Sequence, residues 1–149
     1  MIASNEFGVE RSLCGCSGCQ AKCRFMPGFL VPADLDRMIP AGADPFRWAE
    51  SNLLASPGAL TTADGEMFWI PTLVPAIKGG DRSCIHLRPD GQCGIDAVAP
   101  FGCALLSCGP EVPGLFQNGL LTICSAPDNG LYKLLLLHLS RAGKTQPGY

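Results

Sequence analysis

Two stretches in the first half of the chain have the apolar spacing and flanking residues of short helices. The stretch 32–39 opens with Pro-Ala-Asp, in which proline fits the first turn and the carboxylate complements the helix dipole, and it ends before Pro40. Asp44 is expected to cap a second helix through residues 46–56, which Pro57 would end. The apolar positions near helical spacing in this second stretch are Phe46, Ala49, Leu53 and Leu54.

The pattern then changes to short runs of β-prone residues. Residues 60–62 and 67–70 flank the turn sequence Ala-Asp-Gly-Glu, which predicts a hairpin. Pro71 and Pro75 keep the stretch that follows out of any central strand, because proline cannot donate to a strand ladder. The remaining predicted elements are a hairpin joining residues 84–87 to 92–95 across Arg-Pro-Asp-Gly, a short helix within 100–108, a strand over 120–124, and a helix from 130 or 131 to about 141 that Asp128 caps and Gly143 ends.

Long irregular stretches separate these elements, since the chain of 149 residues contains 18 Gly and 13 Pro. We therefore expect a small, loop-rich α+β fold, with short helices and β-hairpins, that forms a single domain over residues 1–149. A chain of this length can bury roughly 70% of its unfolded surface, and its 47% hydrophobic content excludes a disordered segment. Because extended ladders add little here, a metal that ties the loops together would contribute to folding directly.

Charge and hydropathy exclude two classes of partner. The 11 basic and 13 acidic residues leave a net charge of −2 and no basic stripe, which argues against nucleic-acid binding. The longest apolar run, residues 131–139, is about half of the roughly 20 residues that a membrane span needs, and it contains Lys133 and His138. Asn5 and Glu6 lie where a secretory signal would need apolar residues. We therefore expect a cytoplasmic protein with no nucleic-acid partner and no membrane partner.

The nine cysteines carry most of the functional information. An odd number of thiols without an export signal favours metal or redox chemistry over structural disulfides. Tetrahedral zinc takes four ligands, and an iron–sulfur cluster is commonly held by four cysteines. Apart from Cys124, the cysteines form two groups of four, namely Cys14, Cys16, Cys19 and Cys23 in the first and Cys84, Cys93, Cys103 and Cys108 in the second. These eight residues are the candidate metal ligands.

The first group has the spacing C-x-C-x2-C-x3-C, which is similar to the bacterial ferredoxin run C-x2-C-x2-C-x3-C-P but is one residue shorter and lacks the proline. Four thiols in one glycine-bearing loop would oxidise, or repel one another as thiolates, unless a metal bound them. A thioredoxin-type redox pair at Cys16 and Cys19 is disfavoured because no predicted strand precedes it. The two groups could form two sites, one shared site or a polynuclear cluster.

Other residues have less specific signals. Cys124, in the apolar run Leu-Leu-Thr-Ile-Cys, is expected to be a buried small hydrophobe, and Cys108 could be a ligand or a packing residue. His86 lies between two cysteines and could be a ligand, whereas His138 is expected to pack, partly buried, among the leucines of the last helix. The residues expected to be ordinary cap and surface charges of the first helix are Asp34, Asp36 and Arg37.

The second cysteine group is embedded in four short motifs, Cys84-Ile-His-Leu87, Arg88-Pro-Asp-Gly-Gln92, Cys93-Gly-Ile95 and Ala99-Pro100-Phe-Gly-Cys103. The first group is followed by the acidic helix opening Pro32-Ala-Asp34-Leu-Asp-Arg37. Through these motifs, scattered over residues 14–108, the chain resembles the bacterial cysteine-cluster proteins of the YkgJ-like or CxxCxxCC family, which are described as zinc- or iron-chelating domains. It departs from the family pattern at Cys19-Gln-Ala-Lys-Cys23, which replaces an adjacent cysteine pair, at Asp96, which replaces a tyrosine, and at Ala99 and Ala104, which replace arginines.

The resemblance implies a metal-binding domain that uses about eight cysteines, and it implies no particular reaction. Some larger relatives of the cysteine pattern look like iron–sulfur-dependent enzymes that modify proteins, which favours an iron–sulfur cluster over zinc. The expected function is therefore metal binding in a structural or electron-transfer role.

Two alternatives stay open. One is a metal-dependent enzyme that modifies proteins or does redox chemistry, for which the candidate bases are Asp34, Glu66, Asp96 and His86. The other is an accessory subunit whose metal staples the fold and whose protein partner docks on an exposed face made of Phe25, Phe29, Trp48 and the leucines of the last helix.

Overall fold

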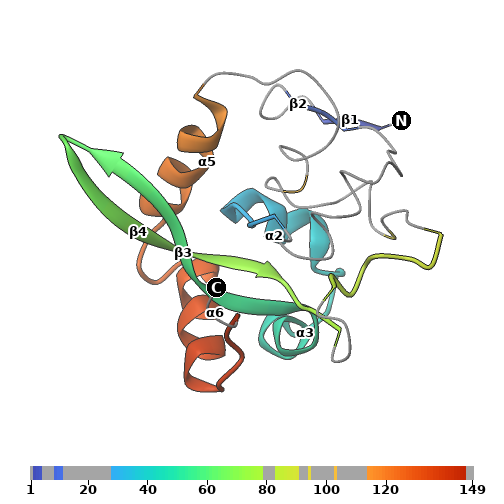
Figure 1. Cartoon of the computed structure of the whole chain (residues 1–149). Helices are drawn as coiled ribbons and strands as arrows, with labels where there is room; N and C mark the ends of the chain where they lie inside the picture. The colour runs from blue at the N-terminus through green and yellow to red at the C-terminus, as the bar shows by residue number, and fades with distance from the viewer. Residues whose placement is uncertain are drawn as a thin grey trace.

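The computed structural model describes residues 2–4, 9–11, 28–78, 83–90, 94, 103 and 114–146. Within these ranges the protein is a small α+β domain with four short helices and one antiparallel two-stranded hairpin (Figure 1). A second, short pair of antiparallel strands, of three residues each, lies near the N-terminus. The predicted α+β class is confirmed. The elements in chain order are β1 (Ile2–Ser4), β2 (Val9–Arg11), α2 (Pro32–Met38), α3 (Pro45–Asn52), β3 (Leu53–Ala63), β4 (Glu66–Pro75), α5 (Leu115–Cys124) and α6 (Leu131–Arg141).

Helix α2 lies where the sequence predicts it. Pro32 occupies the first turn, and the Asp34 carboxylate accepts a hydrogen bond from the backbone N–H of Val31 at 2.9 Å, which satisfies one of the free donors of the helix start. Met38 is the last helical residue, two positions before Pro40.

Helix α3 begins as predicted but ends early. The Asp44 side chain caps it by accepting from the N–H of Phe46 at 3.0 Å. The predicted continuation to residue 56 is wrong, because α3 ends at Asn52 and Leu53 already has the extended angles φ −130° and ψ 160° with which β3 begins. Tertiary hydrogen bonds hold this stretch extended, since Ala55 donates to Lys144 and accepts from Gln146 in the chain after α6.

The hairpin β3–β4 forms around the predicted turn and is much longer than predicted. Asp64 and Gly65 both have positive φ, 52° and 80°, as a tight two-residue turn requires. A bulge interrupts the ladder opposite Pro71, at Gly58, where a Cβ atom would lie 2.0 Å from the carbonyl oxygen of Ile70. Among the described strands β4 pairs only with β3, so its prolines lie in an edge strand, as expected. The turn end of the hairpin extends away from the helices (Figure 1).

The predicted strand over residues 120–124 is wrong, because these residues are the second half of α5. The helix follows Gly114, whose φ of 77° allows the sharp entry into it. Leu120 and Ile123, three positions apart, are both buried against the rest of the protein. A strand would point these two side chains to opposite faces, so burial of both selects the helix over the β-propensity of the run.

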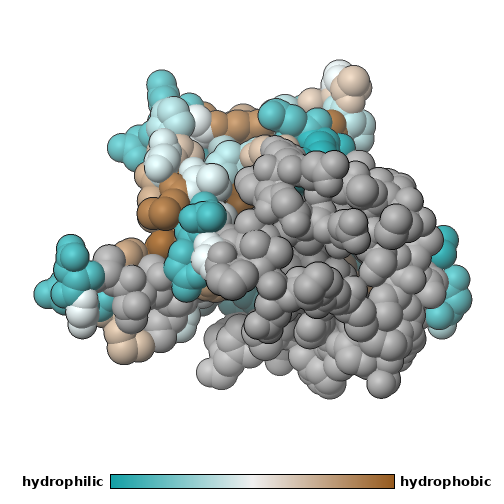
Figure 2. Space-filling view, turned by 90° about the horizontal axis from the view of Figure 1, so that it is seen from above, coloured by the Kyte–Doolittle hydropathy of each residue, from teal (hydrophilic) through white to brown (hydrophobic). Residues whose placement is uncertain are grey.

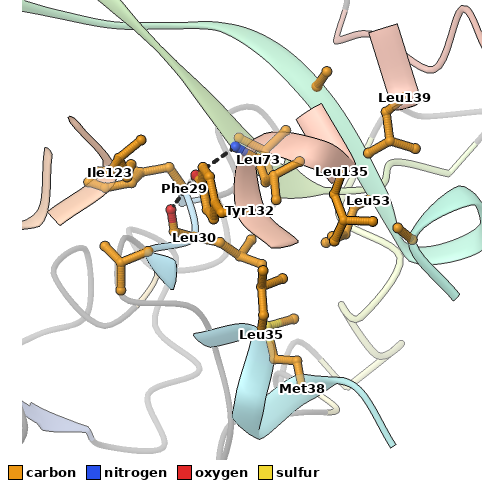
Figure 3. Packing of buried hydrophobic residues seen from close by; sticks show 14 of the residues in the cluster. Phe29, Leu30, Leu35, Met38, Leu53, Leu73, Ile123, Tyr132, Leu135 and Leu139 are labelled. Atoms are coloured by element: carbon orange, nitrogen blue, oxygen red, sulfur yellow. Dashed lines mark hydrogen bonds between the residues drawn. The ribbon is translucent and has the colours of Figure 1, made fainter. Parts of the chain in front are cut away.

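Helix α6 has the predicted bounds, and Gly143 with a φ of 72° follows its end. Its predicted cap is wrong: Gly130 is the N-cap residue, and the exposed Asp128 instead accepts a hydrogen bond from Lys133 Nζ at 3.0 Å. Figure 3 shows Leu135 and Leu139 of this helix packed beside Leu53 of β3. The apolar core that α6 completes consists of Phe29, Leu30, Val31, Leu35, Met38, Ala49, Leu53, Ala55, Ile70, Leu73, Val74, Leu120, Ile123, Tyr132, Leu135 and Leu139.

Several large apolar side chains lie outside this core. The most exposed are Met67 and Trp69 near the turn of the hairpin, at 66% and 61% exposure. Figure 2 shows apolar surface in brown between hydrophilic surface on the described part of one face. None of the described helices has the length and apolar character that crossing a membrane would require.

Candidate metal centre

The structure describes three of the nine cysteines, Cys84, Cys103 and Cys124. Within the described part of the chain, no three or more His, Cys, Asp or Glu side chains converge as a metal site would require. The candidate ligands that lie outside the described residues are Cys14, Cys16, Cys19, Cys23, Cys93 and Cys108. Of the eight candidate ligands, the structure therefore describes the environment of Cys84 and Cys103.

Cys84 lies at the start of a tight turn that pairs with the residues directly after β4. The N–H of Leu87 donates to the Cys84 carbonyl at 3.1 Å and closes this turn over residues 84–87. Ile85 donates to the Ala76 carbonyl at 2.9 Å, and Cys84 forms an antiparallel bridge with Ile77. The side chain of Cys84 is only 5% exposed. Main-chain hydrogen bonds thus hold a buried thiol at a defined place beside the sheet.

The predicted hairpin strand over residues 84–87 is wrong, because these residues form the tight turn. The N–H of Gly94 donates to the carbonyl of His86 at 2.7 Å, so residue 94 lies beside this turn, whereas residues 91–93 and 95, which belong to the other predicted strand and its connection, lie outside the described residues. Lys78 reinforces the same place, because its backbone N–H donates to Ser83 and its Nζ donates to the Leu87 carbonyl, both at 2.7 Å. This ammonium group brings a positive charge to the turn, which suits thiolate ligands.

His86 is the second candidate donor in the turn. Its Nε2 atom is buried and makes no hydrogen bond within the described structure. Burial lowers the pKa of this imidazole from its usual value of 6.5, so the ring is neutral at pH 7. A neutral imidazole is the form that coordinates metals.

Cys103 connects the second cysteine group to the segment that follows the first group. Its half-buried Sγ lies 3.9 Å from the carbonyl oxygen of Gly28. Gly28 opens a buried stretch in which Leu30 donates to the Leu73 carbonyl at 2.8 Å. The Tyr132 hydroxyl donates to the Leu30 carbonyl at 2.6 Å and accepts from the Leu73 N–H at 2.8 Å (Figure 3). The segment beside Cys103 is therefore fixed to both β4 and α6.

Cys124 is exposed, so its expected role as a buried small hydrophobe is wrong. The reason is the helical conformation of α5, which turns the preceding Ile123 into the core and leaves Cys124 on the outer side. His138 is half-buried, as expected. Its Nε2 lies 2.8 Å from Glu50 Oε1, and its ring packs edge-on against Phe46 at 5.2 Å between centroids.

The candidate bases do not gather around these donors in the described structure. Asp34 is fully buried, which contradicts its expected role as a surface charge, and its carboxylate contacts Arg37 as well as the helix start. Asp36 and Glu66 are exposed, and Asp96 lies outside the described residues. The expected role of Asp34 as a cap charge is confirmed, because its carboxylate accepts from the Val31 N–H at the start of α2.

The expected docking face is wrong in part. Phe29 is buried in the core and meets Phe116 edge-on at 5.6 Å, and Trp48 packs partly buried against the core. Phe25 lies outside the described residues. On α6, Leu134 and Leu137 are exposed, whereas the leucines buried by the core are Leu135 and Leu139.

Comparison with known proteins gives no assignment. No protein-family model matches the chain, and no curated protein and no solved structure matches it either.

Proposed function

We propose that this protein binds a metal through its clustered cysteines, as an iron–sulfur cluster or as zinc, and works in the cytoplasm, where thiols stay reduced. The eight ligands of the proposal are Cys14, Cys16, Cys19, Cys23, Cys84, Cys93, Cys103 and Cys108. The observation that carries the proposal is the contact between Cys103 Sγ and the Gly28 carbonyl, because it brings the second cysteine group to the segment that leads from the first.

Chain length supports this step. Cys23 precedes Gly28 by five residues, so their Cα atoms can be at most about 18 Å apart. Cys103 contacts Gly28 directly, at 3.9 Å from its carbonyl oxygen. Ligands from both groups can therefore reach one region of the protein, beside the start of α2.

The turn at residues 84–87 supports convergence within the second group. Gly94 is hydrogen-bonded to His86, two residues from Cys84, and Cys93 directly precedes Gly94. Consecutive Cα atoms are about 3.8 Å apart, so the Cα of Cys93 lies within that distance of the Cα of Gly94, which is bonded to the turn. Two thiols separated by nine positions in sequence are thus available to a single centre.

The donor set fits both candidate metals. Thiolates bind zinc tetrahedrally at about 2.3 Å, and four cysteines hold common iron–sulfur clusters. A bound zinc ion would staple the loops to the core, whereas a cluster would add one-electron transfer. The cysteine motifs resemble a zinc- or iron-chelating family, and some larger relatives of the pattern look like iron–sulfur-dependent enzymes, which favours the cluster. We propose that the loop-rich part of the fold is organised around it.

The test is elemental analysis of protein purified without oxygen, together with its absorption spectrum. Iron and sulfide with visible charge-transfer bands are expected for a cluster, and stoichiometric zinc without colour for a structural site. The double variant Cys16→Ser/Cys19→Ser and the single variant Cys84→Ser should each lose metal. Cys124→Ser is the matched control, because this exposed thiol on α5 lies outside both groups, and it should keep the full metal content. A wild-type protein that is folded and metal-free would refute the proposal.

A further inference from the structure

The imidazole of His86 has an unusual combination of surroundings. Its Nε2 is buried and without a hydrogen-bond partner in the described structure, although buried polar groups in proteins are nearly always paired. The backbone on both sides is well satisfied, since the His86 carbonyl accepts from Gly94 and the Leu87 N–H donates to Cys84. The unpaired atom therefore belongs to a side chain whose own backbone carbonyl is hydrogen-bonded.

The turn brings this nitrogen close to the sulfur chemistry of the second group. Cys84 and His86 occupy the first and third positions of one tight turn, which keeps both side chains within the same small region. Ile85 between them is tied to Ala76, so the turn cannot slide relative to the end of β4. Such a turn presents two donors from one short stretch of chain.

We propose that Nε2 of His86 is a ligand of the metal centre, beside Cys84. This inference rests on the proposed function and adds a nitrogen donor to a site that would otherwise contain sulfur alone. Coordination would give the buried Nε2 a partner, which the described residues do not supply. Imidazole nitrogen joins cysteine in many zinc sites, and histidine replaces cysteine on one iron of some two-iron clusters.

The chain offers a clean test because it contains only two histidines, His86 and His138. Protein with 15N-labelled histidine is purified without oxygen, and the metal that it holds is examined directly. For zinc, X-ray absorption should show a nitrogen shell at about 2.0–2.1 Å beside sulfur at about 2.3 Å. For a reduced iron–sulfur cluster, pulsed electron paramagnetic resonance should show coupling to the labelled nitrogen.

His86→Ala should lose this nitrogen signal, and His138→Ala, which removes the half-buried partner of Glu50, should keep it. His86→Cys covers the case in which the alanine variant does not fold, and it should bind metal with an all-sulfur shell. An all-sulfur shell in wild-type protein, or a nitrogen signal that survives in His86→Ala or His86→Cys, would overturn the inference while leaving the proposed function intact. Wild-type protein without any metal would overturn both.

Discussion

The apolar core and the turn at residues 84–87 are held together by different forces. The core gathers side chains from all four described helices and the hairpin, and it excludes water from them. The turn also buries Cys84 and Leu87, but neither belongs to that core, and main-chain hydrogen bonds hold its place. Burial of apolar surface therefore holds the core, whereas main-chain hydrogen bonds hold the turn, in which the buried Nε2 of His86 makes no hydrogen bond to the described residues.

Tyr132 ties the core to the segment that contacts Cys103. Its hydroxyl links Leu30, in the segment that contacts Cys103, to Leu73 at the centre of the hairpin. We therefore expect a destabilising substitution in the core to disturb the candidate metal centre as well. Loss of metal, in contrast, should leave the core folded. The four predictions that follow test this asymmetry.

The largest effect is expected from a charge in the core. Leu135 is 0% exposed, so Leu135→Glu removes its apolar packing and buries a carboxylate without a partner, and the variant should fail to fold cooperatively. Leu134, one residue earlier on α6 and 38% exposed, is the matched position, and Leu134→Glu should change stability by less than about 1 kcal/mol. Urea unfolding followed by circular dichroism measures both. Equal stability of the two variants would show that α6 does not pack as described.

Removal of metal should act on the turn and spare the core. In metal-loaded protein treated with a chelator, the amides of Leu87 and Gly94 should exchange with solvent roughly tenfold faster or more, because the side chains around them lose their ligand. The amides of Leu30 and Leu73 should keep their protection as internal controls, since they are bonded within the core. Loss of protection at all four amides would mean that the core also depends on the metal.

Tyr132→Phe should produce a moderate loss of stability. The change leaves the carbonyl of Leu30 and the N–H of Leu73 with a missing partner in a buried place, which costs about 1–3 kcal/mol. Thr122→Ala is the control, because it removes an exposed hydroxyl that donates to the Gly119 carbonyl, and it should cost less than about 0.5 kcal/mol. A free energy of unfolding equal to that of wild type would show that the hydroxyl does not link the two segments.

The sequence predicts elements best where local signals agree. Proline, an acidic first turn and a capping aspartate locate the starts of α2 and α3, and Asp64-Gly65 locates the hairpin turn. The errors at Leu53 and at residues 120–124 arise because short apolar runs fit both helical and strand spacing. Tertiary contacts decide these cases: the chain after α6 pairs with β3, and the core takes Leu120 and Ile123 from one face.

The candidate site is predictable in a different way. Cysteine spacing predicts the candidate ligand groups, but it does not indicate that Cys103 meets Gly28, because that contact joins residues 75 positions apart. The same limit applies to the unpaired nitrogen of His86, whose burial depends on the surrounding fold. Residue type identifies a chemistry, whereas only tertiary structure determines which donors share a centre.

The smallest effect is an alkaline pH dependence that comes from Tyr132. Burial, with a smaller contribution from the Asp34 charge, raises the pKa of this phenol well above its usual value of 10, against the opposing hydrogen bond from Leu73. The folded state therefore keeps the proton above pH 10, while the unfolded chain releases it, so the free energy of unfolding falls as pH rises. At pH 11, which is one unit above the pKa of the unfolded chain, this loss is on the order of 1 kcal/mol.

Tyr132→Phe has no proton to lose at this position, so its stability should fall less than that of wild type between pH 8 and pH 11. The comparison is made by urea unfolding of both proteins at the two values, because the other titrating groups, Tyr149 included, are common to both and cancel in the difference. Parallel pH profiles would mean that the hydroxyl is not buried between Leu30 and Leu73, and the proposed link between the core and the candidate metal centre would be lost with it.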